Sequence, residues 1–446
     1  MGLNREFINE NPYLISKCAV VAFHSGEAAA FSQYLDMLYK KLPEISGTHP
    51  DLVETAAFIG GLDFRMPMKQ CVKQAAAMMP LTSFASRDNA QTSTITQNLP
   101  FFHRSMRDFS EYYELKEGDL KEFRDAYGVM IGREFPIMEQ ALIAGIYYER
   151  GALLHAVRYA APGYMSCDHG EMHPETIFLS GMILSATLYA MGASQEAGGI
   201  MERMEDYIER KAQFLRPNFR ALQTERAIRD GNADAAKEWL AVYASRSSRL
   251  PLYQMCRHFA TLRSYMALKE YAAAVKFGAR LQTLATEYKR PLDQIESGLL
   301  TALALWHNSE KNNALKQLKR ALHAAMPYGF TQLFINEGEE ALPLLLELKK
   351  SADKPAGWMR FADRLADSIY KKHDLHPAGE TMPRLSEQQR AMLLYLSKGM
   401  SYNEIAEAAG LGRGTVKSHV LLVYKRLGVR NAREAVVKAK MLGLLE

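Results

Sequence analysis

The chain has only four cysteines in 446 residues, scattered at Cys18, Cys71, Cys167 and Cys256. None of them shows CxxC spacing, so we expect neither a disulfide framework nor a structural zinc site. Such sparse use of cysteine suits a reducing cytosol, and we expect a cytoplasmic protein.

Long hydrophobic runs are missing as well. No stretch of about 18 or more uncharged apolar residues occurs, which argues against a membrane-spanning helix. The opening residues, MGLNREFINENPYLIS, contain no basic segment followed by an apolar core, so we do not expect a signal peptide. No membrane partner is predicted.

The motifs of nucleotide and catalytic chemistry are also absent from the sequence. It contains no GxxxxGK[ST] phosphate loop, no GxSxG motif and no dinucleotide fingerprint, and no paired-carboxylate arrangement stands out. We therefore expect no enzyme activity, no nucleotide binding and no cofactor within these 446 residues.

One segment, CDHGEMHPE at residues 167–175, gathers several residue types that bind metals. His169 and His173 are four positions apart, a spacing that lets two histidines share a metal on one helix face. Gly170 and Pro174 favour a loop over a helix, however, and the HExxH pattern is absent. We therefore predict a polar turn with no metal, and rank a metalloenzyme using these histidines third among the functional hypotheses.

What the sequence does contain is helical periodicity over its first 350 residues. An apolar helix, a short polar or glycine turn and an alanine-rich helix recur, with turns near Gly151, Gly192, Gly231, Lys269 and Glu310. A repeat of about 40 residues built from a helix pair is typical of an α-solenoid. We predict an all-α, TPR-like helical-repeat domain over residues 1–350, whose concave face binds a small-molecule or protein effector. A helical domain with no ligand is the alternative.

Three segments depart from the repeat. Residues 82–100 are polar and predict a long loop, and residues 358–372 predict one more amphipathic helix. Residues 373–383 are rich in proline, glycine and polar residues, which is typical of a flexible linker. We therefore place a helix and a linker at 351–383 and a separate domain at 384–446.

The positive charge of the chain is concentrated in that last segment. Arg384 to Glu446 holds 11 Lys and Arg and 5 Asp and Glu residues, a net charge of +6, whereas the remainder holds 44 and 45, a net charge of −1. A basic module on a neutral body is the electrostatic pattern of nucleic-acid binding, although a solvated basic helix gives the same count.

Start and stop signals predict four helices in this segment. Ser386 can cap the first, and Ser401 with Glu404 forms a capping box that opens the second. A glycine turn leads into the third helix, at about 413–427, and Asn431 with Glu434 opens the fourth. Two short helices joined by a glycine turn form a helix-turn-helix, the alternative being a small bundle that does not bind DNA.

The third helix has two distinct faces. A buried stripe is predicted along Val416, Val420, Val423 and Leu427. The opposite face supplies cations for phosphates, polar groups for base edges and methyl groups for thymine, as a helix in the major groove requires. Its residues are Gly414, Lys417, Ser418, Leu421 and Lys425.

These residues resemble the LuxR-type, or GerE-like, helix-turn-helix domain. The shared features are LSE at Leu385, Gly399, S..EIA at Ser401, GTVKSH at Gly414, Y.RLGV at Tyr424 and EAV at Glu434. The resemblance implies that the helix around Thr415 to Lys425 is the recognition helix and that the fourth helix is a dimerisation surface. The candidate DNA-contacting residues are Ser401, Tyr402, Arg413, Thr415, Lys417, Ser418, Leu421, Lys425 and Arg426.

Some positions depart from the family pattern. Gln389 and Leu422 stand where glutamate and asparagine are usual, and Gly412 and Arg413 stand where the recognition helix usually opens with serine and glutamate. These changes bear on the DNA sequence that is preferred rather than on the fold. The repeats in turn resemble the helical-repeat region of MalT-like regulators over most of residues 14–348. Such regulators usually begin with an ATPase domain, which precedes their repeats.

We therefore expect a bacterial transcription regulator in which a helical-repeat domain senses a signal and controls a C-terminal helix-turn-helix. The expected partners are double-stranded promoter DNA, an effector at the repeats, RNA polymerase as a further candidate, and a second copy of the chain on DNA. The alternative is a protein-interaction scaffold whose terminal helices only dimerise.

Overall fold

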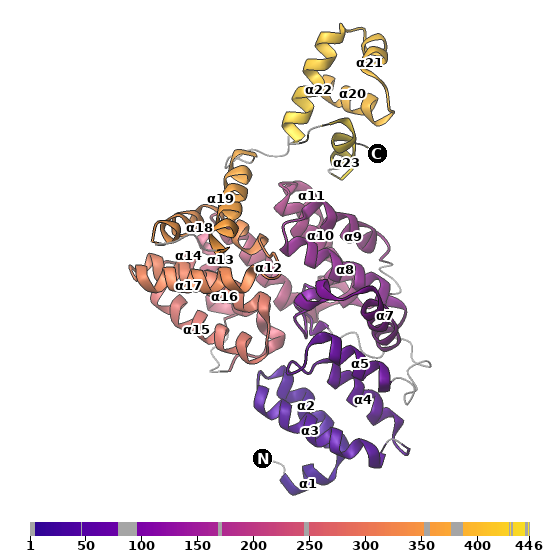
Figure 1. Cartoon of the computed structure of the whole chain (residues 1–446), viewed down its shortest axis with the longest axis vertical. Helices are drawn as coiled ribbons and strands as arrows, with labels where there is room; N and C mark the ends of the chain where they lie inside the picture. Colours follow the sequence, from indigo (N-terminus) through magenta and orange to yellow (C-terminus); the bar gives the residue numbers. More distant parts are fainter. Residues whose placement is uncertain are drawn as a thin grey trace.

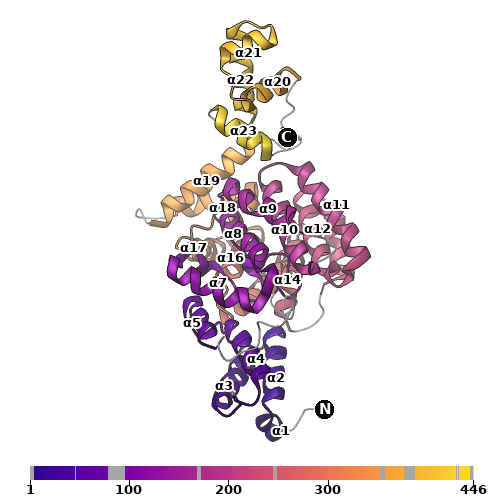
Figure 2. The same ribbon diagram turned by 90° about the vertical axis from the view of Figure 1, so that its right-hand side faces the viewer.

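A computed structural model describes residues 5–45, 47–78, 96–167, 172–244, 249–351, 357–375, 387–427, 429, 431–441 and 445. Within these residues every regular element is an α-helix or a 3-10 helix, as the all-α prediction requires. The long axis of the molecule runs from α1 at one end to the C-terminal helices at the other (Figure 2). None of the described helices combines the length and apolar character needed to cross a membrane.

The N-terminal helices form two hairpins followed by a connecting segment. Asn11 caps α2 by accepting hydrogen bonds from the backbone N–H groups of Tyr13 and Leu14, and Pro12 occupies the first helical turn, where its missing N–H costs nothing. The elements are α1 (Arg5–Glu10), α2 (Pro12–His24), α3 (Ala28–Ile45), α4 (Pro50–Gly61), α5 (Met68–Met78), η3 (Phe102–Arg104), η4 (Ser110–Glu114) and α7 (Glu117–Ile131).

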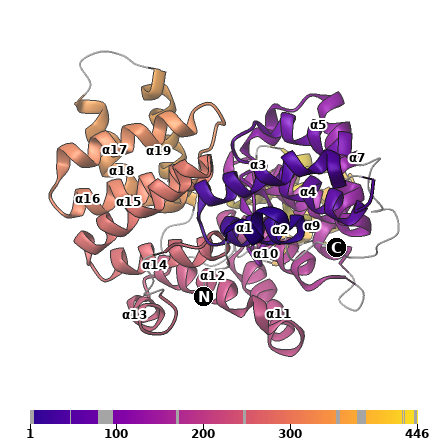
Figure 3. The same ribbon diagram turned by 90° about the horizontal axis from the view of Figure 1, so that it is seen from below.

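Six further helix pairs form the body of the repeat domain and follow an arc, with α9 and α10 on one side and α14 to α17 on the other (Figure 3). Their α-helices are α8 (Phe135–Glu149), α9 (Leu153–Met165), α10 (Pro174–Ala190), α11 (Ser194–Lys211), α12 (Arg216–Arg229), α13 (Ala233–Val242), α14 (Met255–Ala267), α15 (Tyr271–Glu287), α16 (Pro291–His307), α17 (Lys311–Ala325), α18 (Gln332–Lys350) and α19 (Gly357–Leu375).

The turns inside these pairs carry the predicted period. Gly151, Gly192, Gly231 and Lys269 all adopt positive φ, between 60° and 87°. In the next pair the left-handed residue is Ser309, with φ 65°, so that turn lies one residue before the predicted Glu310. A left-handed residue ends a helix and reverses the chain, which explains why glycine recurs at this spacing.

The two helices of a pair differ in burial. Fourteen of the 17 residues of α10 are buried, whereas four of the 18 residues of α11 are buried. A helix that is apolar all round lies between two layers, and an amphipathic helix lies at the surface. The α16–α17 pair shows the same difference, because 13 of the 17 residues of α16 are buried and six of the 15 of α17, so α10 and α16 are inner helices and α11 and α17 outer ones.

A segment from the N-terminal part crosses the inside of the arc. Asn98 accepts a hydrogen bond at its carbonyl from the Asn218 side chain at 2.7 Å, and Arg290 donates to the carbonyl oxygens of Ser105 and Met106 at 2.8 and 3.3 Å. We call residues 96–106, which make these contacts, the strap; they include the end of the predicted loop at 82–100. Residues 82–95 of that loop lie outside the described residues. The strap brings Arg104 into the middle of the repeats.

The C-terminal domain is a bundle of four short helices that lies beyond α19 (Figure 1). The predicted linker begins within α19, which extends to Leu375, and residues 376–386, with Ser386, lie outside the described residues. The four helices are α20 (Glu387–Ser397), α21 (Tyr402–Ala409), α22 (Arg413–Leu427) and α23 (Ala432–Met441).

Candidate nucleic-acid interface and effector cavity

The start and end of α21 are set by side-chain and backbone hydrogen bonds. The Glu404 carboxylate accepts from the backbone N–H of Ser401 at 2.7 Å, and the Ser401 hydroxyl accepts from the N–H of Glu404 at 3.4 Å. This reciprocal cap keeps the pKa of Glu404 below its usual value. At the other end Gly410 adopts φ 64° and ψ 30°, which turns the chain toward α22.

The inner stripe of α22 fixes its orientation. Val416, Val420, Val423 and Leu427 are each at most 1 % exposed. They belong to one apolar core with buried residues of the other three helices, namely Met392, Leu393, Leu396, Ile405, Ala435 and Ala439. The opposite face of α22 is therefore held toward solvent.

That outward face holds most of the residues predicted to contact DNA. Arg413, Thr415, Lys417 and Ser418 are exposed, and Leu421 is 52 % exposed. Ser401 is also exposed, at the N-terminus of α21. Lys425 and Arg426 lie on α22, but their side chains are outside the described residues.

The charge of α22 has one sign. Four of its residues are lysine or arginine, and none of the 15 from Arg413 to Leu427 is aspartate or glutamate. Phosphates can therefore approach this face without meeting a carboxylate on the same helix.

Two family models match this chain. Residues 383–439 match the bacterial regulatory proteins of the luxR family, and residues 130–351 match the MalT-like TPR region. This chain combines a LuxR-type helix-turn-helix with a MalT-like repeat region. The repeat match begins at residue 130, whereas the resemblance seen in the sequence reached back to about residue 14.

Similar proteins include transcriptional regulators named MalT. The HTH-type transcriptional regulator MalT of Serratia proteamaculans (strain 568) is 24 % identical over 230 residues, which are 48 % of this chain and 25 % of that protein. The MalT proteins of Yersinia pestis (strain Pestoides F) and Yersinia pseudotuberculosis serotype O:1b (strain IP 31758) are each 26 % identical over 162 residues, 32 % of this chain. The matches span a quarter or less of the length of these relatives.

Within the LuxR-type domain, Tyr402 is less accessible than the sequence indicates. It is half-buried, and its hydroxyl oxygen lies 3.5 Å from that of Tyr424 on α22. Burial, and then the contact with Tyr402, raise the pKa of the Tyr424 hydroxyl. Tyr424 was absent from the predicted site, and its contact with Tyr402 links α21 to α22.

The LuxR-type recognition helix also exposes two neighbouring leucines. Leu421 and Leu422 are 52 % and 44 % exposed. Only Leu421 was a predicted contact, because Leu422 was noted merely as a departure from asparagine. Both leucines therefore add exposed apolar surface to α22.

The histidine segment lies within the MalT-like region, and its His173 has a structural role. His173 precedes α10, and its ring Nδ1 accepts a hydrogen bond from the backbone N–H of Glu175 at 3.3 Å. His169 lies outside the described residues, and among those described no group of three or more His, Cys, Asp or Glu side chains is placed to hold a metal ion.

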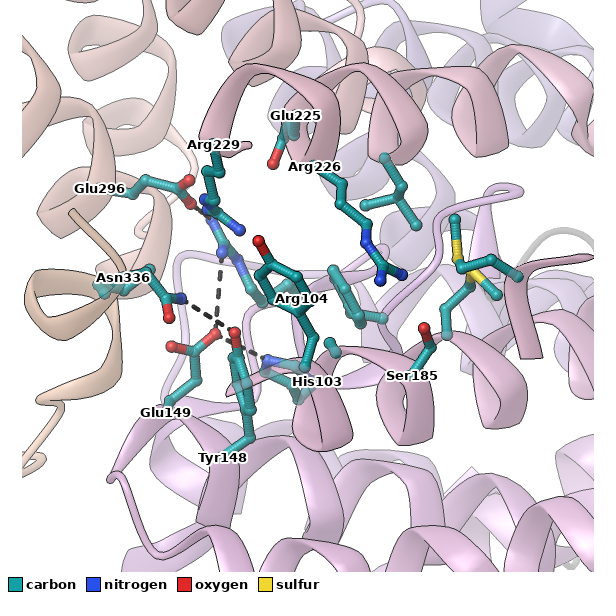
Figure 4. A pocket seen from close by; sticks show the side chains of 17 residues that line it. His103, Arg104, Tyr148, Glu149, Ser185, Glu225, Arg226, Arg229, Glu296 and Asn336 are labelled. Carbon is teal, nitrogen blue, oxygen red and sulfur yellow. Dashed lines mark hydrogen bonds and ion pairs between the residues drawn. The ribbon is translucent and has the colours of Figure 1, made fainter. Parts of the chain in front are cut away.

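The inner side of the repeat domain holds a cavity of about 100 Å³ that is open to solvent. Its walls come from η3 of the strap and from α8, α10, α11, α12, α16 and α18 (Figure 4). An open cavity of this size accepts a very small molecule or one end of a larger ligand. It lies where the sequence predicted an effector, but the residues that line it are far apart in the chain and share no motif.

A network of buried ion pairs lies beside the cavity. Arg104 contacts Asp293 at 2.7 Å and Glu296 at 2.5 Å, and Arg263 contacts Glu296 at 2.7 Å and Glu337 at 2.8 Å. Desolvation opposes the ionisation of Glu296, but the two guanidinium groups outweigh it and lower its pKa. Because breaking one member of such a network leaves a buried charge unpaired, these residues fix the strap against α16 and α14.

Proposed function

We propose that this chain is a transcription regulator whose LuxR-type domain binds double-stranded DNA through the outward face of α22. The observation that carries the proposal is the separation of the two faces: the valine stripe is buried, whereas Lys417, Ser418 and Leu421 are exposed on a helix without acidic residues. A helix of this kind fits the major groove as the second helix of a helix-turn-helix.

Each exposed group has a distinct role in this proposal. Lys417 neutralises phosphate, with Lys425 and Arg426 predicted to do the same. Thr415 and Ser418 reach base edges, and the methyl groups of Leu421 contact thymine. In the free protein the Ser418 hydroxyl donates to the carbonyl oxygen of Gly414 at 3.0 Å, so it presents an acceptor to the DNA unless it rotates. Two copies would read two half-sites.

The repeat region would regulate this binding through α18 and α19. Asn336 of α18 lines the cavity, and two residues later Gly338 breaks the helix with φ 49° and ψ −121°. The chain then continues through α19 to the helix-turn-helix. An effector in the cavity would contact α8 and α18 together and shift the population of conformations in which the DNA-binding domains can pair.

The proposal is tested by selecting bound sequences from a random DNA duplex library with the full chain, followed by footprinting of the enriched sequence. We expect a defined protected site whose affinity falls steeply as salt rises. Enrichment of no sequence would reject the proposal and favour an interaction scaffold. Repeating the selection with Lys417→Ala asks whether α22 is the reading helix.

A further inference from the structure

Glu149, at the end of α8, lines the cavity and has one buried carboxylate oxygen that is unsatisfied. The side chain is 2 % exposed, and its Oε1 lies 3.2 Å from Nε2 of His103 and 3.8 Å from Nη1 of Arg104. Its Oε2 has no hydrogen-bond partner among the described residues. A buried carboxylate oxygen without a donor is costly, so Glu149 places beside the cavity a negative charge that its own neighbours only partly satisfy.

A second carboxylate on the cavity wall is also short of donors. Glu225 of α12 is 12 % exposed, and the cation nearest to it is Arg263, whose Nε lies 3.6 Å away, too far for a hydrogen bond. The other two guanidinium nitrogens of Arg263 form ion pairs with Glu337 and Glu296. Burial raises the pKa of the Glu225 carboxyl, although Arg263 acts in the opposite direction.

Two arginines of α12 supply the complementary charge. Arg226 lies over the Tyr189 ring, 4.7 Å from its centroid, and donates to the carbonyl oxygen of Ser194 at 3.1 Å. Arg229 forms no ion pair with any residue that the structure describes, and it lines the same cavity. Figure 4 shows both arginines reaching the cavity from α12, while Glu149 reaches it from the side of α8.

The charges that line the cavity already balance, three against three: Arg104, Arg226 and Arg229 face Glu149, Glu225 and Glu296. A ligand with a net charge would upset that balance. A zwitterion would not, since it brings donors to the carboxylates and acceptors to the arginines. The remaining wall is largely apolar, with Met182, Met201, Leu222 and Leu333.

We propose that this cavity binds a small zwitterion with an apolar group, of the class of a free α-amino acid or a dipeptide. Its ammonium group contacts Glu225, with the negative charge of Glu149 nearby, and its carboxylate contacts Arg226 and Arg229. The role of this ligand as the effector rests on the proposed function. Its binding to the cavity is independent of that function.

Isothermal titration calorimetry of the full chain tests the assignment with L-phenylalanine and L-leucyl-L-leucine as probes. N-acetyl-L-phenylalanine lacks the cation and L-phenylalanine methyl ester lacks the anion. We expect at least one zwitterion to bind and both of the blocked compounds to bind about ten-fold or more weakly. Binding of neither zwitterion, or equal binding of the blocked compounds, would overturn the proposal.

Two variants locate the charges. Arg229→Gln should weaken binding of the zwitterion about ten-fold and leave the methyl ester unchanged, because the ester has no carboxylate to lose. Glu225→Gln should weaken the zwitterion and leave the N-acetyl compound unchanged. Arg210→Gln, on the exposed face of α11, is the matched control, and thermal unfolding checks that each variant folds. If Arg229→Gln and Arg210→Gln behave alike, the ligand does not occupy this cavity.

The outcome is separable from that of the proposed function. Loss of DNA binding by the helix-turn-helix would leave the calorimetry untouched. Ligand binding that does not change DNA affinity would keep the zwitterion site and remove its role as a sensor.

Discussion

The backbone N–H of Thr331, at the start of α18, donates to the carbonyl oxygen of Glu149, at the end of α8, at 2.8 Å. A second hydrogen bond joins the same two helices, because the Asn336 side chain of α18 donates to the Tyr148 hydroxyl of α8 at 2.9 Å. The first and last inner helices of the MalT-like region thus meet across the cavity. A signal that separates or tightens them would move α18, which leads to the DNA-binding domain.

This junction depends on Gly151. A Cβ at this position would lie 2.7 Å from Oγ1 of Thr331, whereas one at Gly231 would meet nothing within 4 Å. Both glycines have positive φ, so an alanine at either costs about 1 kcal/mol in backbone strain. We expect Gly231→Ala to lower the free energy of unfolding by about that amount and Gly151→Ala by about 2–3 kcal/mol, since overpacking adds to strain. Urea titration measures both; equal losses would show that the junction is not tight.

Lys417 should contribute affinity without contributing sequence preference. Lys417→Ala removes one phosphate contact, so we expect weaker binding to every duplex and a salt dependence whose slope falls by about 1. Fluorescence anisotropy at several salt concentrations measures it. Lys237→Ala, an exposed lysine of α13, is the control for charge alone. If the salt dependence of DNA affinity has the same slope in both variants, Lys417 does not contact a phosphate.

Leu421 and Val420 are adjacent but should act on different properties. Val420 is fully buried, so Val420→Ala should cost roughly 2 kcal/mol of stability of the helix-turn-helix. Leu421 is 52 % exposed, so Leu421→Ala should change stability by less than about 0.5 kcal/mol and instead relax the preference at one base pair by about 1 kcal/mol. Thermal unfolding and binding to single-base variants of the site separate the two effects. A destabilised Leu421→Ala protein would mean that this face is packed rather than free.

The ion pairs under the cavity predict a loss of stability in acid. Desolvation opposes the ionisation of Asp293 and Glu296, yet neighbouring arginines hold both pKa values below the usual 3.8 and 4.5. Their contribution to stability is therefore complete above those unfolded-state values and is lost as pH falls through the lower values of the folded protein. Glu225, whose pKa is raised, contributes in the opposite sense, and its stabilisation is lost as pH rises through its folded value.

Urea titrations between about pH 3 and pH 7 follow this dependence. Asp293→Asn should flatten the acid side of the curve, because the side chain no longer titrates, while Glu202→Gln at an exposed position should not. An unchanged acid slope in Asp293→Asn would show that other carboxylates govern it.

The helix-turn-helix could be predicted almost residue by residue because its signals are local. The Ser401 and Glu404 cap, the Gly410 turn and the valine stripe each act within a few positions of the chain, and the helices begin and end where these residues require. The turn period of the repeats was readable for the same reason, since a left-handed glycine is a local requirement.

The cavity was decided by tertiary structure. Arg104 meets Asp293 and Glu296, and Glu149 meets Thr331, only because the strap crosses the arc and the arc closes on itself. Isolated charged residues on predicted helices look like solvent-exposed ones, and whether they are buried depends on which distant helix covers them. Sequence periodicity specifies how a helix pairs with its neighbour, but the accumulated rotation of many pairs brings the ends together, and no short stretch of residues encodes that sum.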